Sequence, residues 1–211
     1  MNNQKIKLNI FDRKYENEFH VINNTYKNFE EFLLKKGFLF TKGTNLGFWA
    51  GTPMKSMFEA FNILFEHDKL EKERKKEISF CDLGSGDGRV VLLASLFNVD
   101  KIVGIESDAW LHEVSLHIKD KVNFNEFSKT EFIRNDFSVH NIKDYDYVFI
   151  APDRPFHRGL EDKFLEELEG KLIVHSNIFH PEKLKKIQEF DFNGEKFIVY
   201  EKLMLVMGFG S

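Results

Sequence analysis

The chain has 211 residues, a net charge of -4, 42% hydrophobic residues, 30% charged residues and a single cysteine. These values are typical of a globular protein, exclude an internal disulfide and give no overall positive field for binding nucleic acid. No apolar stretch approaches the roughly 20 residues that span a bilayer. The first residues also lack the pattern of a secretory signal, so we expect a cytoplasmic protein without a membrane segment.

A helix is predicted near the start of the chain. Between residues 14 and 36, apolar side chains recur every three or four positions, and Gly37 ends the pattern. We assign residues 1–51 to an N-terminal extension whose helix either packs on the main domain or covers its site. The segment 38–49 is rich in aromatic residues and has no clear period, so we expect an irregular loop there.

A second helix is predicted to begin at Thr52 and Pro53. Threonine is a favoured N-cap residue, and proline is favoured in the first helical position because its missing amide proton would be unpaired there. The apolar residues that follow, as far as Phe65, have helical spacing, and we interpret them as core.

The most informative stretch is 78–89. An apolar run ends at Asp82, and three glycines then alternate with other residues, at Gly84, Gly86 and Gly88. A helical apolar pattern resumes directly afterwards, which predicts a strand, a tight loop and a helix. Because glycine has no Cβ, the backbone of such a loop can approach a ligand closely.

Acidic residues in and beside this loop indicate the charge of the ligand. A dinucleotide site has the spacing G-x-G-x-x-G/A, whereas here the last glycine falls one residue early and Arg89 takes the final small position. Asp82 and Asp87 would repel a pyrophosphate but could bind a cation such as S-adenosylmethionine through charge-assisted hydrogen bonds. A dinucleotide-binding protein and a purely structural turn are the alternatives.

An acid followed by x-G-x-G-x-G resembles the first motif of the class I, seven-strand S-adenosylmethionine-dependent methyltransferases. The resemblance covers about residues 52–205. It implies an α/β, Rossmann-like fold with a seven-stranded, mostly parallel sheet, helices on both faces and an antiparallel C-terminal hairpin. Residues 52–211 would form this methyltransferase domain, after the N-terminal helical extension.

The remaining elements fit such a sheet. Apolar runs predict strands at 101–106, 131–134, 145–151 and 171–175. Helical patterns predict helices at 108–127, 159–169 and 181–187. Asn193-Gly194 separates two further strand-like runs, at 189–192 and 196–205, and predicts a hairpin turn.

Two strand ends carry further candidates for the cofactor. Glu106 closes the strand 101–106, about 20 residues past the glycines, where an acid accepts hydrogen bonds from the ribose hydroxyls. The resemblance implies that Asp136 accepts a hydrogen bond from the adenine amino group and that Phe137 covers the ring. The alternative for Asp136 is an Asx turn.

The segment 47–53 resembles the aromatic-x-x-Thr-Pro entry of archaeal and mitochondrial seven-strand protein-lysine methyltransferases. In that family the threonine and its loop lie over the methionine end of the cofactor. No metal is predicted, because His112 and His117 lack the spacing of a helical metal pair. The residues assigned to the cofactor are Trp49, Thr52, Asp82, Gly84, Ser85, Gly86, Asp87, Gly88, Arg89, Glu106, Asp136, Phe137 and Pro152.

The segment after the fourth strand, 151–156, is where the resemblance places substrate chemistry. Methyltransferases that act on adenine or glutamine have Asp or Asn before Pro-Pro and an aromatic residue, whereas Ala151 precedes Pro152 here. A lysine acceptor must instead lose a proton from a group with a pKa of about 10.4. Desolvation by aromatic side chains and a nearby acid favour that loss, and Phe48, Trp49, Asp153 and Phe156 are the candidates.

We therefore predict a protein-lysine N-methyltransferase that uses S-adenosylmethionine and releases S-adenosylhomocysteine, with Asp153 as the candidate catalytic residue. Its partner is the methyl acceptor, expected to be a protein. The alternatives are a nucleic-acid methyltransferase, a small-molecule methyltransferase and a non-catalytic cofactor-binding module.

Overall fold

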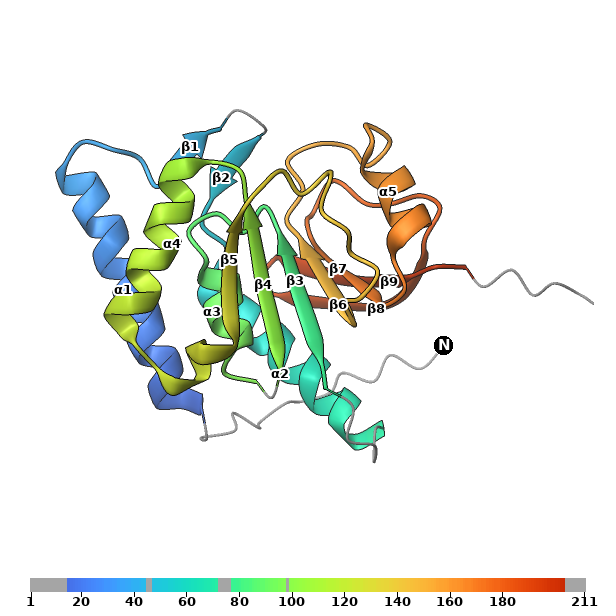
Figure 1. The fold of residues 1–211 in the computed structure, drawn as a ribbon, viewed down its shortest axis with the longest axis horizontal. Coiled ribbons are helices and arrows are strands. Elements are labelled where there is room, and N and C mark those ends of the chain that lie inside the picture. Colours follow the sequence, from blue (N-terminus) through green and yellow to red (C-terminus); the bar gives the residue numbers. More distant parts are fainter. Residues whose placement is uncertain (1–14, 45–46, 72–76, 98, 204–211) are drawn as a thin grey trace, which may run out of the picture.

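The computed structural model describes residues 15–44, 47–71, 77–97 and 99–203 (Figure 1). Its centre is a seven-stranded sheet with the order β5-β4-β3-β6-β7-β9-β8. The strands are β3 (Ser79–Leu83), β4 (Lys101–Glu106), β5 (Thr130–Arg134), β6 (Tyr147–Ile150), β7 (Lys171–His175), β8 (Lys185–Phe192) and β9 (Glu195–Glu201). Strands β3 to β7 are parallel, and β9 is antiparallel to both of its neighbours. The predicted fold class is confirmed.

The order of the strands reverses between β3 and β6. From β3 the chain moves outward through β4 to β5, then returns to pair β6 with the other side of β3. In open α/β sheets, ligands bind beyond the carboxyl ends of the strands at such a switch point. The glycine-rich stretch follows β3 directly, so the fold places it there.

Helices cover both faces of the sheet, and each face has its own apolar core. One core joins the sheet to α1 (Glu16–Lys35), α2 (Met54–Glu71), α3 (Arg89–Ala94) and α4 (Ala109–Val122). The other core joins it to α5 (Leu160–Glu167) and the segments beside that helix. A short 3-10 helix, Asn125–Lys129, precedes β5. In the part of the chain that the structure describes, no helix is long and apolar enough to cross a membrane.

The predicted N-terminal helix is confirmed as α1, and it packs on the domain. It lies against α3 and α4, outside the helical layer that contacts the sheet (Figure 1). Phe19, Ile22, Tyr26 and Leu33 form its buried stripe, at the predicted spacing of three or four residues.

The prediction of an irregular loop at 38–49 is wrong. Two short strands, β1 (Thr41–Gly43) and β2 (Phe48–Ala50), form an antiparallel pair in which Gly43 lies opposite Phe48. Strands of three residues are too short to show an alternating pattern, so these two could not be recognised from the sequence.

The prediction of a helix at 181–187 is also wrong, because β8 begins at Lys185. Strand β8 is an edge strand, and an irregularity in its pairing between Lys186 and Gln188 breaks the alternation of its side chains. The predicted turn after it is confirmed, since Asn193 and Gly194 have φ angles of 57° and 88° between β8 and β9.

Candidate functional site

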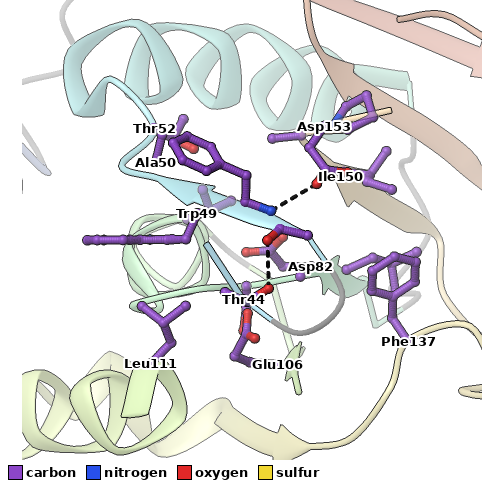
Figure 2. Close-up of a pocket in the computed structure, with 18 of the residues that line it drawn as sticks. Thr44, Trp49, Ala50, Thr52, Asp82, Glu106, Leu111, Phe137, Ile150 and Asp153 are labelled. Carbon is purple, nitrogen blue, oxygen red and sulfur yellow. Dashed lines mark hydrogen bonds between the residues drawn. The ribbon is translucent and has the colours of Figure 1, made fainter. Parts of the chain in front are cut away.

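A pocket lies beyond the carboxyl ends of β3, β4 and β6, with the β1–β2 hairpin on one side (Figure 2). Most of the residues predicted to form the site line this pocket. They are Phe48, Trp49, Thr52, Asp82, Gly84, Ser85, Asp87, Arg89, Glu106, Phe137, Pro152 and Asp153. Gly86, Gly88 and Asp136 are not among the lining residues.

The three glycines of the loop have different surroundings. All have positive φ angles, of 77° at Gly84, 55° at Gly86 and 82° at Gly88, which other residues rarely adopt. A Cβ on Gly86 would lie 2.5 Å from Cδ1 of Trp49, and one on Gly88 would lie 2.6 Å from Cζ of Phe132. Gly86 and Gly88 are therefore needed for close packing of the loop, whereas Gly84 faces the pocket.

The carboxylate of Glu106 is held in one orientation at the end of β4. Its Oε2 accepts a hydrogen bond from the amide of Gly86 at 2.8 Å, and its Oε1 accepts one from the amide of Asp108 at 2.7 Å. A carboxylate has about four acceptor positions, so these bonds leave capacity for a ligand. Asp108 is itself fixed, because its side chain caps α4 by accepting from the amides of Trp110 and Leu111.

Asp82 is buried at the end of β3, with 2% of its surface exposed. Its Oδ2 has no hydrogen-bond partner among the described residues. Burial raises the pKa of Asp82 well above its usual value, and the nearby charges of Glu106 and Asp87 raise it further. A buried acceptor beside a second carboxylate favours a ligand that brings a positive charge or a hydrogen-bond donor.

Asp87 and Arg89 line the same pocket, but their charges are directed at each other. Arg89 Nη2 lies 2.7 Å from Asp87 Oδ2, and Nε donates to Oδ1 at 3.1 Å. Arg89 Nη1 also forms an ion pair with Glu30 of α1 at 2.9 Å. The carboxylate of Asp87 is thus compensated within the protein, unlike that of Asp82.

The structure places the side chains of Asp136 and Phe137 in different surroundings, and only Phe137 lines the pocket. The Oδ1 of Asp136 accepts a hydrogen bond from the amide of Ser138 at 2.8 Å, which is the Asx-turn alternative. Phe137 lines the pocket, and its ring lies near Gly84, 3.8 Å from the position that a Cβ there would occupy.

Asp153 links the segment after β6 to the hairpin. Its Oδ2 accepts a hydrogen bond from the amide of Phe48 at 2.8 Å, and its Oδ1 accepts one from Nε of Arg154 at 2.8 Å. Partial burial alone would raise the pKa of Asp153, but the bonds from Arg154 and Phe48 outweigh it and lower the pKa. Asp153 is therefore an anion that holds protons weakly, which suits binding a cation better than accepting a proton.

Phe156, also a candidate for the acceptor side, packs in the core against Phe164, with 5.9 Å between the ring centres.

Other lining residues were not predicted from the sequence, and they include Thr44, Leu111, Phe149 and Ile150. Phe149 and Ile150 lie at the carboxyl end of β6, beside β3, and this position could have indicated that they line the pocket. Thr44 gave no such indication, because the hairpin that carries it was read as a loop.

Comparison with known proteins identifies the group to which this site belongs. The ANTKMT methyltransferase domain matches residues 82–188, just over half of the chain. The chain belongs to the ANTKMT methyltransferase domain family. It is an S-adenosylmethionine-dependent methyltransferase of class I, and the resemblance stated from the glycine motif is confirmed.

Solved structures give the same fold. An RNA methyltransferase from Salinibacter ruber, in complex with S-adenosyl-L-homocysteine, is 22% identical and has a TM-score of 0.57 over 72% of this chain and 92% of its own. Magnesium protoporphyrin IX methyltransferase from Synechocystis PCC 6803, with bound S-adenosylmethionine, is 12% identical, with a TM-score of 0.52 over 70% and 79%. A search of curated proteins gives no significant match.

The residues of the pocket fit the cofactor of this methyltransferase. S-adenosylmethionine carries an ammonium and a sulfonium, and the unpartnered oxygen of Asp82 lies in a pocket that Glu106 also lines. The ring of Phe137 offers an apolar surface to a base. Among the residues that the structure describes, no cluster of three His, Cys, Asp or Glu side chains could hold a metal ion.

Asp82→Asn should stabilise the ligand-free methyltransferase, and more so as the pH rises. The folded state keeps a proton on Asp82 that the unfolded state has lost above its pKa of about 3.9, so wild-type stability falls with pH from that value toward the raised pKa of the folded protein. Each pH unit between those two pKa values should add up to about 1.4 kcal/mol to the gain, because the neutral amide of Asn has no proton to take up on folding. Urea unfolding of both proteins between pH 5 and 8 measures it; equal stability at every pH would contradict the prediction.

Proposed function

We propose that this methyltransferase transfers a methyl group to the side-chain nitrogen of a lysine in a protein. The observation that carries the proposal is the match to the ANTKMT domain, a protein-lysine methyltransferase family, over residues 82–188, which include the glycine-rich loop, β4 and β6. The segment after β6 agrees with it, because Ala151 stands where methyltransferases that act on adenine or glutamine place Asp or Asn.

The cofactor would be held by groups from three strand ends. Asp82 accepts hydrogen bonds from the ammonium, and Glu106 accepts them from the ribose hydroxyls. Phe137 lies against the adenine, while Trp49 and Thr52 enclose the methionine end. When bound, the cofactor supplies an activated methyl group on sulfur. The protein's contribution is therefore to hold the cofactor and the acceptor nitrogen in line.

The acceptor would approach beside the β1–β2 hairpin. Phe48, which is 58% exposed, lies next to Asp153 through their hydrogen bond and presents an apolar surface near the pocket. Asp153 pairs with Arg154 at 2.8 Å, and its remaining acceptor positions would orient a lysine ammonium without favouring its deprotonation. Loss of the proton would come from desolvation of the ammonium between Phe48 and the cofactor, whose positive charge lowers the pKa of a neighbouring amine.

Glu106→Ala should weaken cofactor binding by about 2 kcal/mol, or roughly thirtyfold, because a charge-assisted hydrogen bond to the ribose is lost. Isothermal titration calorimetry with S-adenosylhomocysteine measures the change. Glu113→Ala, an exposed glutamate of α4, is the matched control and should bind like the wild type. Unchanged affinity in Glu106→Ala would show that the ribose lies elsewhere.

Asp153→Asn should lower turnover at least tenfold while leaving affinity for S-adenosylhomocysteine within about twofold. The variant keeps the size of the side chain but removes the charge that orients the ammonium, and tenfold corresponds to about 1.4 kcal/mol in the transition state. Label transfer at saturating cofactor measures turnover. Full activity would remove Asp153 from the mechanism.

The acceptor class is tested by incubating native-source lysate with the methyltransferase and labelled cofactor. Label that is lost on protease treatment, resists nuclease and is recovered as methyl-lysine after hydrolysis is the expected result. Label that nuclease removes would identify a nucleic-acid acceptor, and label in the small-molecule fraction a metabolite. The Glu106→Ala variant serves as the control for labelling by other enzymes in the lysate.

A further inference from the structure

Two side chains of α1 reach the glycine-rich loop from outside the region that the family domain matches. The hydroxyl of Tyr26 donates a hydrogen bond to the main-chain oxygen of Asp87 at 3.0 Å. Glu30, one turn further along, lies with Oε1 2.9 Å from Nη1 of Arg89. Both contacts end on residues of the segment 82–89, although the helix precedes that segment by about fifty residues.

The Arg89 guanidinium is the centre of this arrangement. It is 5% exposed, and its Nε and Nη2 face Asp87 while its Nη1 faces Glu30. The ring of Tyr26 lies 4.8 Å from its central carbon. A buried guanidinium is stable only when the donors on every side of it are paired. Asp87 pairs with Nε and Nη2, and Glu30 orients the remaining nitrogen, Nη1.

Space around the guanidinium is tight on the side of the hairpin. A Cβ on Gly51 would lie 2.4 Å from Nη1 of Arg89, and that same nitrogen lies 3.4 Å from the main-chain oxygen of Thr52. A rotation of the guanidinium would therefore disturb both the loop that contains Asp87 and the segment that leads into α2. The pairing with Glu30, together with the bonds to Asp87, opposes that rotation.

We propose that Tyr26 and Glu30 are positioning residues for the cofactor loop, so that α1 is a working part of the cofactor site. The loop contains three glycines at positive φ and would sample many conformations without support. Two contacts from α1 hold it in one conformation before the cofactor binds, which lowers the entropy lost on binding. Because coupling is reciprocal, a bound cofactor should also hold α1 more firmly on the domain.

Adjacent glutamates on α1 provide a matched test. Glu30 pairs with Arg89, whereas the side chain of Glu31 is 64% exposed and lies 3.7 Å from Lys35 on the same helix. Glu30→Ala should weaken binding of S-adenosylhomocysteine at least fivefold, the lower range of site-to-site coupling. Glu31→Ala makes the same change in the same helix and should bind within twofold of the wild type. Calorimetry measures both, on protein shown to be folded by circular dichroism.

Tyr26→Phe separates positioning from packing, because it removes the hydroxyl and keeps the ring in the core. It should also weaken binding, by at least twofold, with little change in melting temperature. Lower melting temperatures with unchanged affinity in both Glu30→Ala and Tyr26→Phe would overturn the proposal and leave α1 as a packing element only.

Hydrogen exchange of the wild-type protein gives a measurement that does not depend on whether the variants fold. S-adenosylhomocysteine should slow exchange in the part of α1 around Tyr26 and Glu30 more than in the β8–β9 hairpin, which lies at the far edge of the sheet. Equal slowing in both regions, or none in α1, would contradict the proposal. None of these experiments involves a methyl acceptor, so their outcome is independent of the lysine assignment.

Discussion

The structure depends on two carboxylates that are buried together at the switch point of the sheet. Asp82 is the penultimate residue of β3, Glu106 ends the neighbouring β4, and both line one pocket. Glu106 is satisfied by two main-chain amides, but Asp82 retains an oxygen without a partner among the described residues. Such a group lowers the stability of the empty protein. We interpret this loss as a consequence of binding a cationic cofactor, whose charge would replace the missing partner.

The pocket is held in shape by elements that lie outside the glycine motif. Successive side chains of β2 point to opposite faces, so the adjacent residues Phe48 and Trp49 face different directions. Trp49 packs against Gly86 of the cofactor loop, while the amide of Phe48 binds Asp153 on the acceptor side. Lys42 of β1 forms an ion pair with Asp108 at 2.6 Å, which joins the hairpin to α4. One short hairpin thus connects both ends of the site.

The sequence allowed the sheet, most of its strands and twelve of the lining residues to be predicted, because apolar runs and glycine spacing depend on local chemistry. It could not show that the Gly86 and Gly88 backbones pack on Trp49 and Phe132, since those contacts join distant segments. For the same reason Asp87 was assigned to the ligand, although its charge is taken by Arg89. Phe156 was a candidate for the acceptor side because it is an aromatic residue in the segment 151–156, but it packs in the core.

The balance of charge in the pocket also bears on the direction of the reaction. With Asp87 compensated by Arg89, the carboxylates that remain to act on the cofactor are those of Asp82 and Glu106. Methyl transfer removes the positive charge from sulfur, so the product interacts less favourably with these two anions than the cofactor does. Carboxylates at this position therefore favour binding of the charged cofactor and release of the neutral thioether. A pyrophosphate, which is negatively charged, would be repelled by the same pair. Burial also raises the pKa of Asp82, so the empty pocket favours the neutral acid there, and a cationic ligand that binds beside it favours loss of its proton.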